Sequence, residues 1–188
     1  MTLPIMAFGQ PILRKIAEPI TKDYPELKEL IADMYETMYA SNGVGLAAPQ
    51  IGKSIRLIVI DTNPLADDYP DGKDYKQVFI NATITELSGD DWVFNEGCLS
   101  VPELREDVIR KSKVHIEYYD QDFNFHSEEF DGVRARVIQH EYDHLQGILF
   151  VDRVSSLKKM LIKRRLTEIS KGMVSPKYKM IFPHQKKR

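Results

Sequence analysis

The sequence predicts an α+β protein in which mainly antiparallel sheets pack around a central helix, followed by a C-terminal helix or extended tail. Along the chain, one helical pattern is followed by several strand patterns and two further helices, which favours this class over alternating α/β folds. Two of the predicted strands flank a short turn at 120–122, so we expect them to pair antiparallel. A length of 188 residues fits one domain with a substantial core.

The first helix is predicted over residues 25–42. Pro25 suits the first helical position, where its missing N–H costs no hydrogen bond. Apolar residues then recur every three or four positions, and Asn42-Gly43 is typical of a helix end. The apolar stripe consists of Leu27, Leu30, Ile31, Met34 and Met38.

The middle of the chain contains the strand patterns, which are rich in β-branched and aromatic residues and separated by polar turns. The stretch 43–52, which reads GVGLAAPQIG, precedes them. Its glycines and small residues indicate backbone that passes close to another group. The predicted strands cover residues 55–60, 77–87, 92–94, 114–119 and 124–130.

A second helix is predicted to begin near Gly132, with Asp131 as its N-cap. A third is predicted over residues 155–170 and ends before Gly172. The tail 174–183 is β-prone but contains prolines, which favours an edge strand. In the second helix, four residues share one face at helical spacing: Val133, Val137, His140 and His144.

Composition and charge limit the classes of function. With 43% hydrophobic and 29% charged residues, the chain is typical of globular proteins, and no apolar run reaches the roughly 18 residues that span a bilayer. The N-terminus lacks the pattern of a targeting peptide, so we expect a cytoplasmic protein. Because Cys98 is the only cysteine, an internal disulfide is excluded.

The charge is divided unevenly along the chain. Residues 157–188 carry eleven Lys/Arg and one acid, so this segment is +10 and residues 1–156 are −12 within a total of −2. We expect a catalytic region over 1–156 and a basic C-terminal helix and tail over 157–188, both parts of one domain. The basic segment is either a contact for a polyanion or a solvated helix face.

The segment 139–147 reads QHEYDHLQG and contains the pattern H-E-x-x-H. On a helix, His140 and His144 lie one turn apart on the same face, at a spacing that suits one metal ion. Glu141 lies beside them and can move a proton to or from water. Two imidazoles and a carboxylate buried together are costly without a metal, so the pattern indicates a metal site.

A catalytic metal site usually has a third protein ligand. In the extended pattern H-E-x-x-H-x-x-G-x-x-H this would be a histidine at position 150, where the chain has Phe150. Cys98 is favoured because it follows Gly97 in a turn, and a thiolate with two imidazoles suits zinc or iron. The residues alone leave other candidates open: Glu168, His115, His126 and His184.

Three motifs together resemble the bacterial-type peptide deformylase family. They are GVGLAAPQ at 43–50, EGCLS at 96–100 and QHEYDHLQG at 139–147, in the family's order and at similar spacing. The stretch FGQPILRKIA at 8–17 is also similar, and the likeness covers roughly residues 5–155. It implies metal-dependent hydrolysis of the N-formyl group from the formylmethionine of newly made polypeptides, with release of formate.

The resemblance also implies roles for the motif residues. Glu141 would be the general base, while the Gln50 side chain and the Leu99 backbone N–H would stabilise the oxyanion. The implied metal ligands are Cys98, His140 and His144. The implied substrate-binding residues are Val44, Gly45, Gly97, Val133 and Val137.

The positions of two arginines near these motifs, Arg136 and Arg110, can also be predicted. Arg136 lies where the family is often apolar, and a helical step of about 100° from Val137 would turn it to the rim of the methionine pocket. Arg110 is expected to pair with Glu96 and so hold the loop that carries Cys98.

The resemblance favours Fe2+ in the cell, with Zn2+, Ni2+ or Co2+ as ions that a purified sample could hold. We expect a monomer that acts on formyl-methionyl nascent peptides. The basic segment would dock on the ribosome, and neither a membrane nor DNA is expected as a partner.

Two other functions remain open at this point. They are a zinc endopeptidase that uses Glu168 as third ligand and an RNA-binding module without chemistry.

Overall fold

A computed structural model, which describes residues 1–183, confirms an α+β architecture with an antiparallel sheet. The main sheet has five strands, arranged in the order in which they follow one another in the sequence. Each neighbouring pair is antiparallel. The strands are β2 (Gly45–Ala47), β3 (Leu57–Asp61), β4 (Lys76–Cys98), β5 (Val101–Tyr119) and β6 (Phe125–Asp131).

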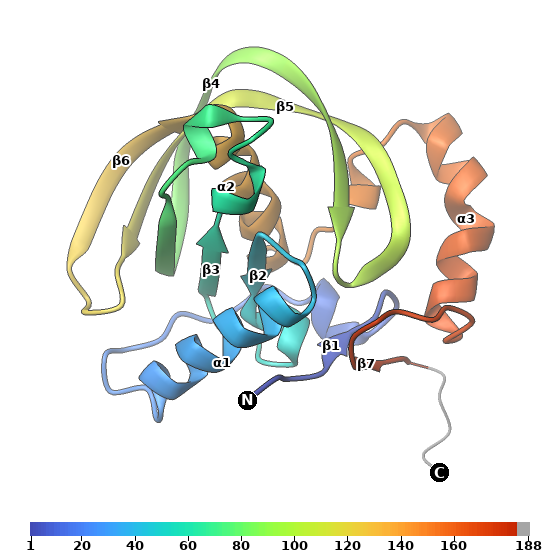
Figure 1. Cartoon of the computed structure of the whole chain (residues 1–188), viewed down its shortest axis with the longest axis horizontal. Coiled ribbons are helices and arrows are strands. Elements are labelled where there is room, and N and C mark those ends of the chain that lie inside the picture. Colours follow the sequence, from blue (N-terminus) through green and yellow to red (C-terminus); the bar gives the residue numbers. More distant parts are fainter. Residues whose placement is uncertain (184–188) are drawn as a thin grey trace.

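β4 and β5 are far longer than the sequence suggested, and together they form a high arch over the molecule (Figure 1). The runs predicted at 77–87 and 92–94 belong to one strand, which continues through a register shift between Ser88 and Asp91. Much of this arch exposes side chains on both faces, so its sequence lacks a strong apolar alternation. That is why only fragments of it were predicted.

α1 (Leu27–Ala40) begins two residues later than predicted, because Glu26 adopts a left-handed conformation with φ 55° that a helix cannot contain. The predicted apolar stripe is buried as expected. α3 (Ser156–Ser170) also matches its prediction, and its N-cap Ser155 accepts a hydrogen bond from the Lys158 N–H at 3.3 Å.

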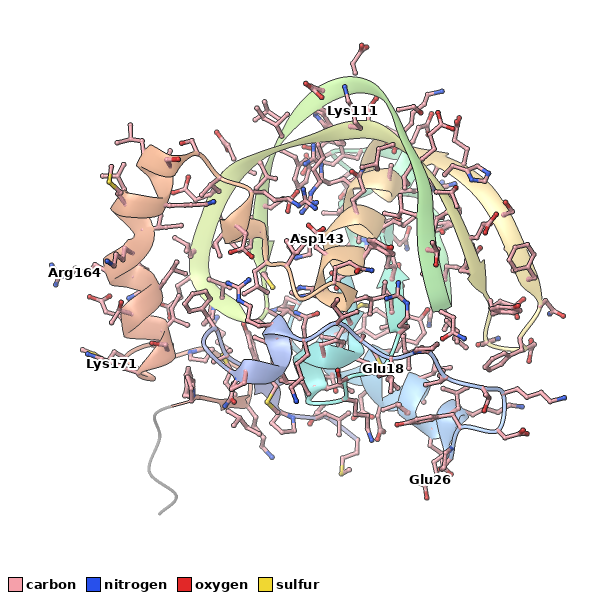
Figure 2. The ribbon with its side chains drawn as sticks, turned by 180° about the vertical axis from the view of Figure 1, so that it is seen from behind. Glu18, Glu26, Lys111, Asp143, Arg164 and Lys171 are labelled. Atoms are coloured by element: carbon pink, nitrogen blue, oxygen red, sulfur yellow. The ribbon has the colours of Figure 1, made fainter. Side chains whose placement is uncertain are left out.

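α2 (Gly132–Leu145) lies beneath the arch, and Figure 2 shows Asp143 of this helix in the middle of the molecule. Asp131 occupies the N-cap position, but its side chain makes no capping hydrogen bond. The carboxylate of Asp71, from the loop before β4, accepts from the Val133 N–H at 2.7 Å instead. A residue distant in sequence therefore stabilises the start of the helix.

The two ends of the described chain meet. β1 (Ile5–Met6) and β7 (Met180–Ile181) form a parallel two-stranded sheet, so two residues of the tail are in a strand. Within residues 1–183, no helix has both the length and the apolar character needed to cross a membrane.

The turn from β4 to β5 is held between two apolar clusters. Leu99 packs against the cluster that α1 forms with β2 and β3, whereas Cys98 and Val101 belong with the cluster beside α3. Because both sides are packed, the turn is fixed near the C-terminal half of α2.

Candidate metal centre and active site

The fold brings Cys98 to the histidines of α2. The ligand atoms of Cys98, His140 and His144 all lie within 4.8 Å of one another. The Cys98 Sγ is 3.4 Å from the His144 Nε2, and the two imidazole rings are 5.4 Å apart at their centroids. This is a group of soft and borderline donors gathered around one point, as a transition-metal site requires.

The other candidates for the third ligand lie elsewhere. Glu168 pairs with Arg164 and Arg165 on α3, so the structure gives no support to the endopeptidase arrangement. His115 bonds to Thr85 and His126 to Asp120, both away from the cluster, and His184 lies outside the described residues. Phe150 is buried, and its ring packs on His140 with centroids 6.1 Å apart. It therefore supports a ring of the cluster where the extended pattern would supply a ligand.

Glu96 orients His140. Its Oε2 lies 2.8 Å from the His140 Nδ1, and Arg110 donates to both of its carboxylate oxygens, as predicted. Burial opposes ionisation of Glu96, but hydrogen bonds from His140 and Arg110 hold its pKa below the usual range. Because Nδ1 is occupied, the Nε2 of His140 is left to face the cluster.

Arg136 lines the cavity described below, but it is buried and does not form an exposed rim. It is 2% exposed, and its Nη1 donates to the Glu96 Oε1 at 2.9 Å. The guanidinium also donates to the backbone carbonyls of Val108 and Trp92 and lies over the Trp92 ring. The arch of β4 and β5 covers this side of α2, which the spacing within the helix could not reveal.

Gly45 and Glu141 fit against each other. A Cβ on Gly45 would lie 2.5 Å from the Glu141 Oε1, so only glycine leaves room for the carboxylate. The Glu141 Oε2 is buried and has no hydrogen-bond partner in the part of the chain that the structure describes. Burial raises the pKa of Glu141 to about 7, which suits proton exchange near neutral pH.

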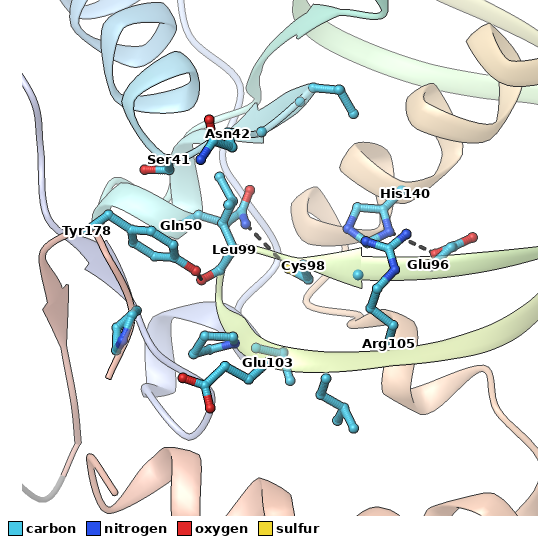
Figure 3. A pocket seen from close by; sticks show the side chains of 18 of the residues that line it. Ser41, Asn42, Gln50, Glu96, Cys98, Leu99, Glu103, Arg105, His140 and Tyr178 are labelled. Carbon is cyan, nitrogen blue, oxygen red and sulfur yellow. Dashed lines mark hydrogen bonds and ion pairs between the residues drawn. The ribbon is translucent and has the colours of Figure 1, made fainter. Parts of the chain in front are cut away.

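Gln50 is buried and aimed at the cluster (Figure 3). Its Oε1 accepts from the Ala47 N–H at 2.9 Å, which fixes the orientation of the amide. The opposite atom, Nε2, is 3.5 Å from the Cys98 Sγ and 3.3 Å from the Ser100 Oγ. The Nε2 of Gln50, a hydrogen-bond donor, therefore lies next to the two residues that flank Leu99 in the β4–β5 turn.

A cavity of about 580 Å³ opens onto this group. Val44, Gly45, Gly97 and Val137, four of the predicted substrate-binding residues, are among those that line it. Val133 does not, because it is fully buried lower on α2, where a Cβ on Gly72 would touch it at 3.0 Å.

The tail supplies a wall of the cavity that the sequence analysis missed. Residues 175–178 line it, although they follow α3 and belong to none of the motifs. The signal available in the sequence was an alternation of residue character along the tail, which predicted a strand but not its position.

Within the described residues, a Cys/His/His cluster lies beside a buried glutamate oxygen that has no hydrogen-bond partner, an arrangement typical of metal-dependent hydrolases. The family model described as "Polypeptide deformylase" matches residues 2–160. The curated peptide deformylase of Flavobacterium johnsoniae is 55% identical over 194 residues, which cover 100% of this chain and 99% of that protein.

Solved structures of peptide deformylases are also similar to this chain in sequence and fold. A peptide deformylase from Legionella pneumophila is 39% identical with a TM-score of 0.79, covering 92% of this chain and 98% of that one. The enzyme from Thermotoga maritima is 41% identical with a TM-score of 0.74, covering 82% and 99%. The chain therefore belongs to the polypeptide deformylase family, of the bacterial type, and removes the N-formyl group from newly made polypeptides.

Proposed function

We propose that Cys98, His140 and His144 hold one divalent cation at the site of deformylation. Their donor atoms are close enough to share one ion, and a thiolate with two imidazoles suits iron or zinc. The contact of His140 with Glu96 leaves the Nε2 of His140 as the ligand nitrogen. When bound, the cation supplies Lewis acidity, which polarises the formyl carbonyl and lowers the pKa of water.

We assign proton transfer to Glu141. Its carboxylate takes a proton from the attacking water and delivers it to the leaving nitrogen. The formyl C–N bond then breaks, which gives formate and a free α-amine. The buried Oε2, which has no hydrogen-bond partner among residues 1–183, and the raised pKa of Glu141 support this role.

Gln50 and Leu99 stabilise the negative charge that develops on the formyl oxygen. The Gln50 Nε2 and the Leu99 backbone N–H are the donors, and preorganised donors of this kind act without rearranging during the reaction. The bond from Ala47 to the Gln50 Oε1 supports this assignment, because it keeps Nε2 turned toward Cys98.

The methionine side chain occupies the apolar part of the cavity, with Val44 and Val137 among its walls. Gly45 and Gly97 lie along the path of the substrate backbone. A formyl carbon carries only hydrogen, so a narrow approach admits it and excludes larger acyl groups.

One observation carries this assignment: Gln50, Cys98 and Glu141 come from three distant motifs and line one cavity. The test compares a formyl-Met peptide with the matching acetyl-Met peptide. We expect formate only from the first. Cleavage within an unformylated peptide, or equal turnover of the acetyl peptide, would contradict the proposal.

For the metal, we propose Fe2+ in the cell, since the donor set accepts iron and family resemblance favours it. Protein purified without oxygen should contain iron in proportion to its turnover, measured by elemental analysis of the same fractions. Full turnover in fractions that contain zinc and no iron would contradict this.

The outer face of α3 is proposed as a ribosome contact. Lys159, Lys163 and Lys171 are exposed there, and Figure 2 shows Arg164 and Lys171 on the side of the helix away from the body. Residues 186–188 of the basic segment lie outside the described residues. Lys159→Glu with Lys163→Glu should weaken a salt-sensitive association with ribosomes and leave hydrolysis of a short peptide unchanged. Unchanged ribosome binding would argue for a solvated helix face.

Two further proposals concern organisation. We infer that residues 157–183 share one domain with residues 1–156, because Ile162 and Ile169 of α3 are buried against that part of the chain.

We also infer a cytoplasmic location, because newly made formylated chains appear there. Cell fractionation with a tagged chain would test this.

A further inference from the structure

The chain returns to the active site after α3 in a segment that we call the C-terminal strap, residues 173–183. The family model ends at residue 160, so the whole strap lies beyond it. Nevertheless, Ser175–Tyr178 form part of the lining of the substrate cavity. Figure 3 shows the Tyr178 ring reaching from the strap toward Leu99.

The strap is a packed part of the fold. Its residues alternate between exposed and partly buried, with Val174, Pro176, Tyr178 and Met180 on the covered side. The Ile5 N–H donates to the Lys179 carbonyl at 2.9 Å, which joins the strap to β1. Phe182 is buried beyond this pairing. Before Tyr178, the Ser175 N–H donates to the Glu103 Oε1 at 3.4 Å, so the strap is held on both sides of Tyr178.

Tyr178 acts on Leu99 through one hydrogen bond. Its phenol donates to the Leu99 carbonyl at 2.8 Å. Burial raises the pKa of the Tyr178 phenol above its ordinary value, so the group stays protonated and remains a donor. Leu99 therefore has its carbonyl held by the strap.

A second contact, with Gly43, restrains the side chain of Leu99. A Cβ on Gly43 would lie 2.8 Å from the Leu99 Cδ1, so this side chain fills the space over the glycine. With the carbonyl and the side chain both constrained, little rotation remains for the Leu99 backbone. These contacts restrain the Cα of Leu99, to which the N–H group of the preceding peptide is attached.

We propose that Tyr178 is a positioning residue for deformylation, which holds the Leu99 backbone so that its N–H faces the formyl oxygen. This rests on the oxyanion role proposed for Leu99. Donors of this kind act only if they are held at the place where charge develops, so a looser turn lowers transition-state binding more than substrate binding.

The test is Tyr178→Phe in the full-length, metal-loaded protein, because this change keeps the ring and removes only the donor. We expect kcat for a short formyl-Met peptide to fall about three- to tenfold, the worth of one neutral hydrogen bond. KM and metal content should match the wild type, and the melting temperature should fall by no more than the few degrees that one lost hydrogen bond costs. Hydrogen exchange of residues 98–101 should become faster.

The matched control is Tyr118→Phe, which removes a 2.7 Å bond to Glu128 outside the cavity and should leave kcat unchanged. Wild-type kcat and exchange in Tyr178→Phe would overturn the inference. A lower kcat accompanied by loss of metal, or by a fall in melting temperature larger than one hydrogen bond explains, would overturn it in favour of a purely structural role.

Glu141→Gln, measured in parallel, separates this inference from the proposed active site. Wild-type turnover in Glu141→Gln overturns the active site itself. Near-complete loss in Glu141→Gln, together with an unchanged Tyr178→Phe, overturns only the role of Tyr178.

Discussion

The Oε2 of Glu96 lies 2.8 Å from the Nδ1 of His140, and this contact joins the metal cluster to a buried network of charges. The same carboxylate accepts from Arg110 and Arg136. Arg110 in turn donates to Asp143 on the next turn of α2 at 2.7 Å. The ring that faces Cys98 is therefore oriented by a network that spans β4, β5 and α2.

Glu96→Gln should weaken metal binding about 10- to 100-fold, because the amide no longer holds the Nδ1 of His140 as a charged acceptor. Competition between the metal-free protein and a chromophoric chelator measures this. Glu86→Gln, on an exposed part of β4, is the control and should bind like the wild type. Equal affinities in the two variants would show that Glu96 does not act on the cluster.

Arg136→Met should destabilise the protein by about 3 kcal/mol, since it leaves a buried carboxylate short of one ionic partner. Urea unfolding gives this free energy. Arg105→Met changes an exposed arginine and should stay within about 0.5 kcal/mol of the wild type. If both variants unfold alike, the buried pair contributes nothing to stability.

Gly45→Ala should lower kcat at least about 100-fold while the protein still folds. The added Cβ meets the Glu141 carboxylate and must displace it, and a shift of about 1 Å in a catalytic group has effects of this size. Formate release and a circular dichroism melt would be measured on one preparation. Wild-type turnover would mean that Glu141 adjusts freely.

Glu141→Gln should keep the bound metal and the melting temperature but lose about 100- to 10,000-fold in kcat, the usual contribution of a general base. Elemental analysis and formate release provide the two readouts. Retention of the wild-type rate would remove the general base from the mechanism and point to a module whose function is binding.

Removal of the metal by a chelator should lower the melting temperature, because the cluster of Cys98, His140 and His144 exists only in the folded chain. At a free metal concentration 100 times Kd, the bound ion adds about 2.7 kcal/mol. Cys98→Ser lacks one donor and is the control, for which added metal should shift the melt much less. An identical shift in both proteins would place the metal elsewhere.

Contacts formed within one turn of helix could be predicted from the sequence. Helical geometry places residues three and four apart on the same face. It therefore puts His144 one turn from both His140 and Glu141 in α2. The apolar stripe of α1 and the extent of α3 followed from the same local rules. The likeness of three motifs to one family then indicated Cys98 and Gln50, which local spacing alone could not pair with the helix.

Contacts that depend on how distant segments approach one another required the tertiary structure. Arg136 was expected at the rim of the methionine pocket. It lines the cavity but is buried, because the arch brings Glu96 and Trp92 to it from some 40 residues away. Val133 was expected in the cavity but faces Gly72, and Tyr178 reaches Leu99 across 79 residues. A sequence determines which side chains share a face of an element, because that geometry is local. Only the packed chain decides what each face meets, since that depends on the summed burial of all elements together.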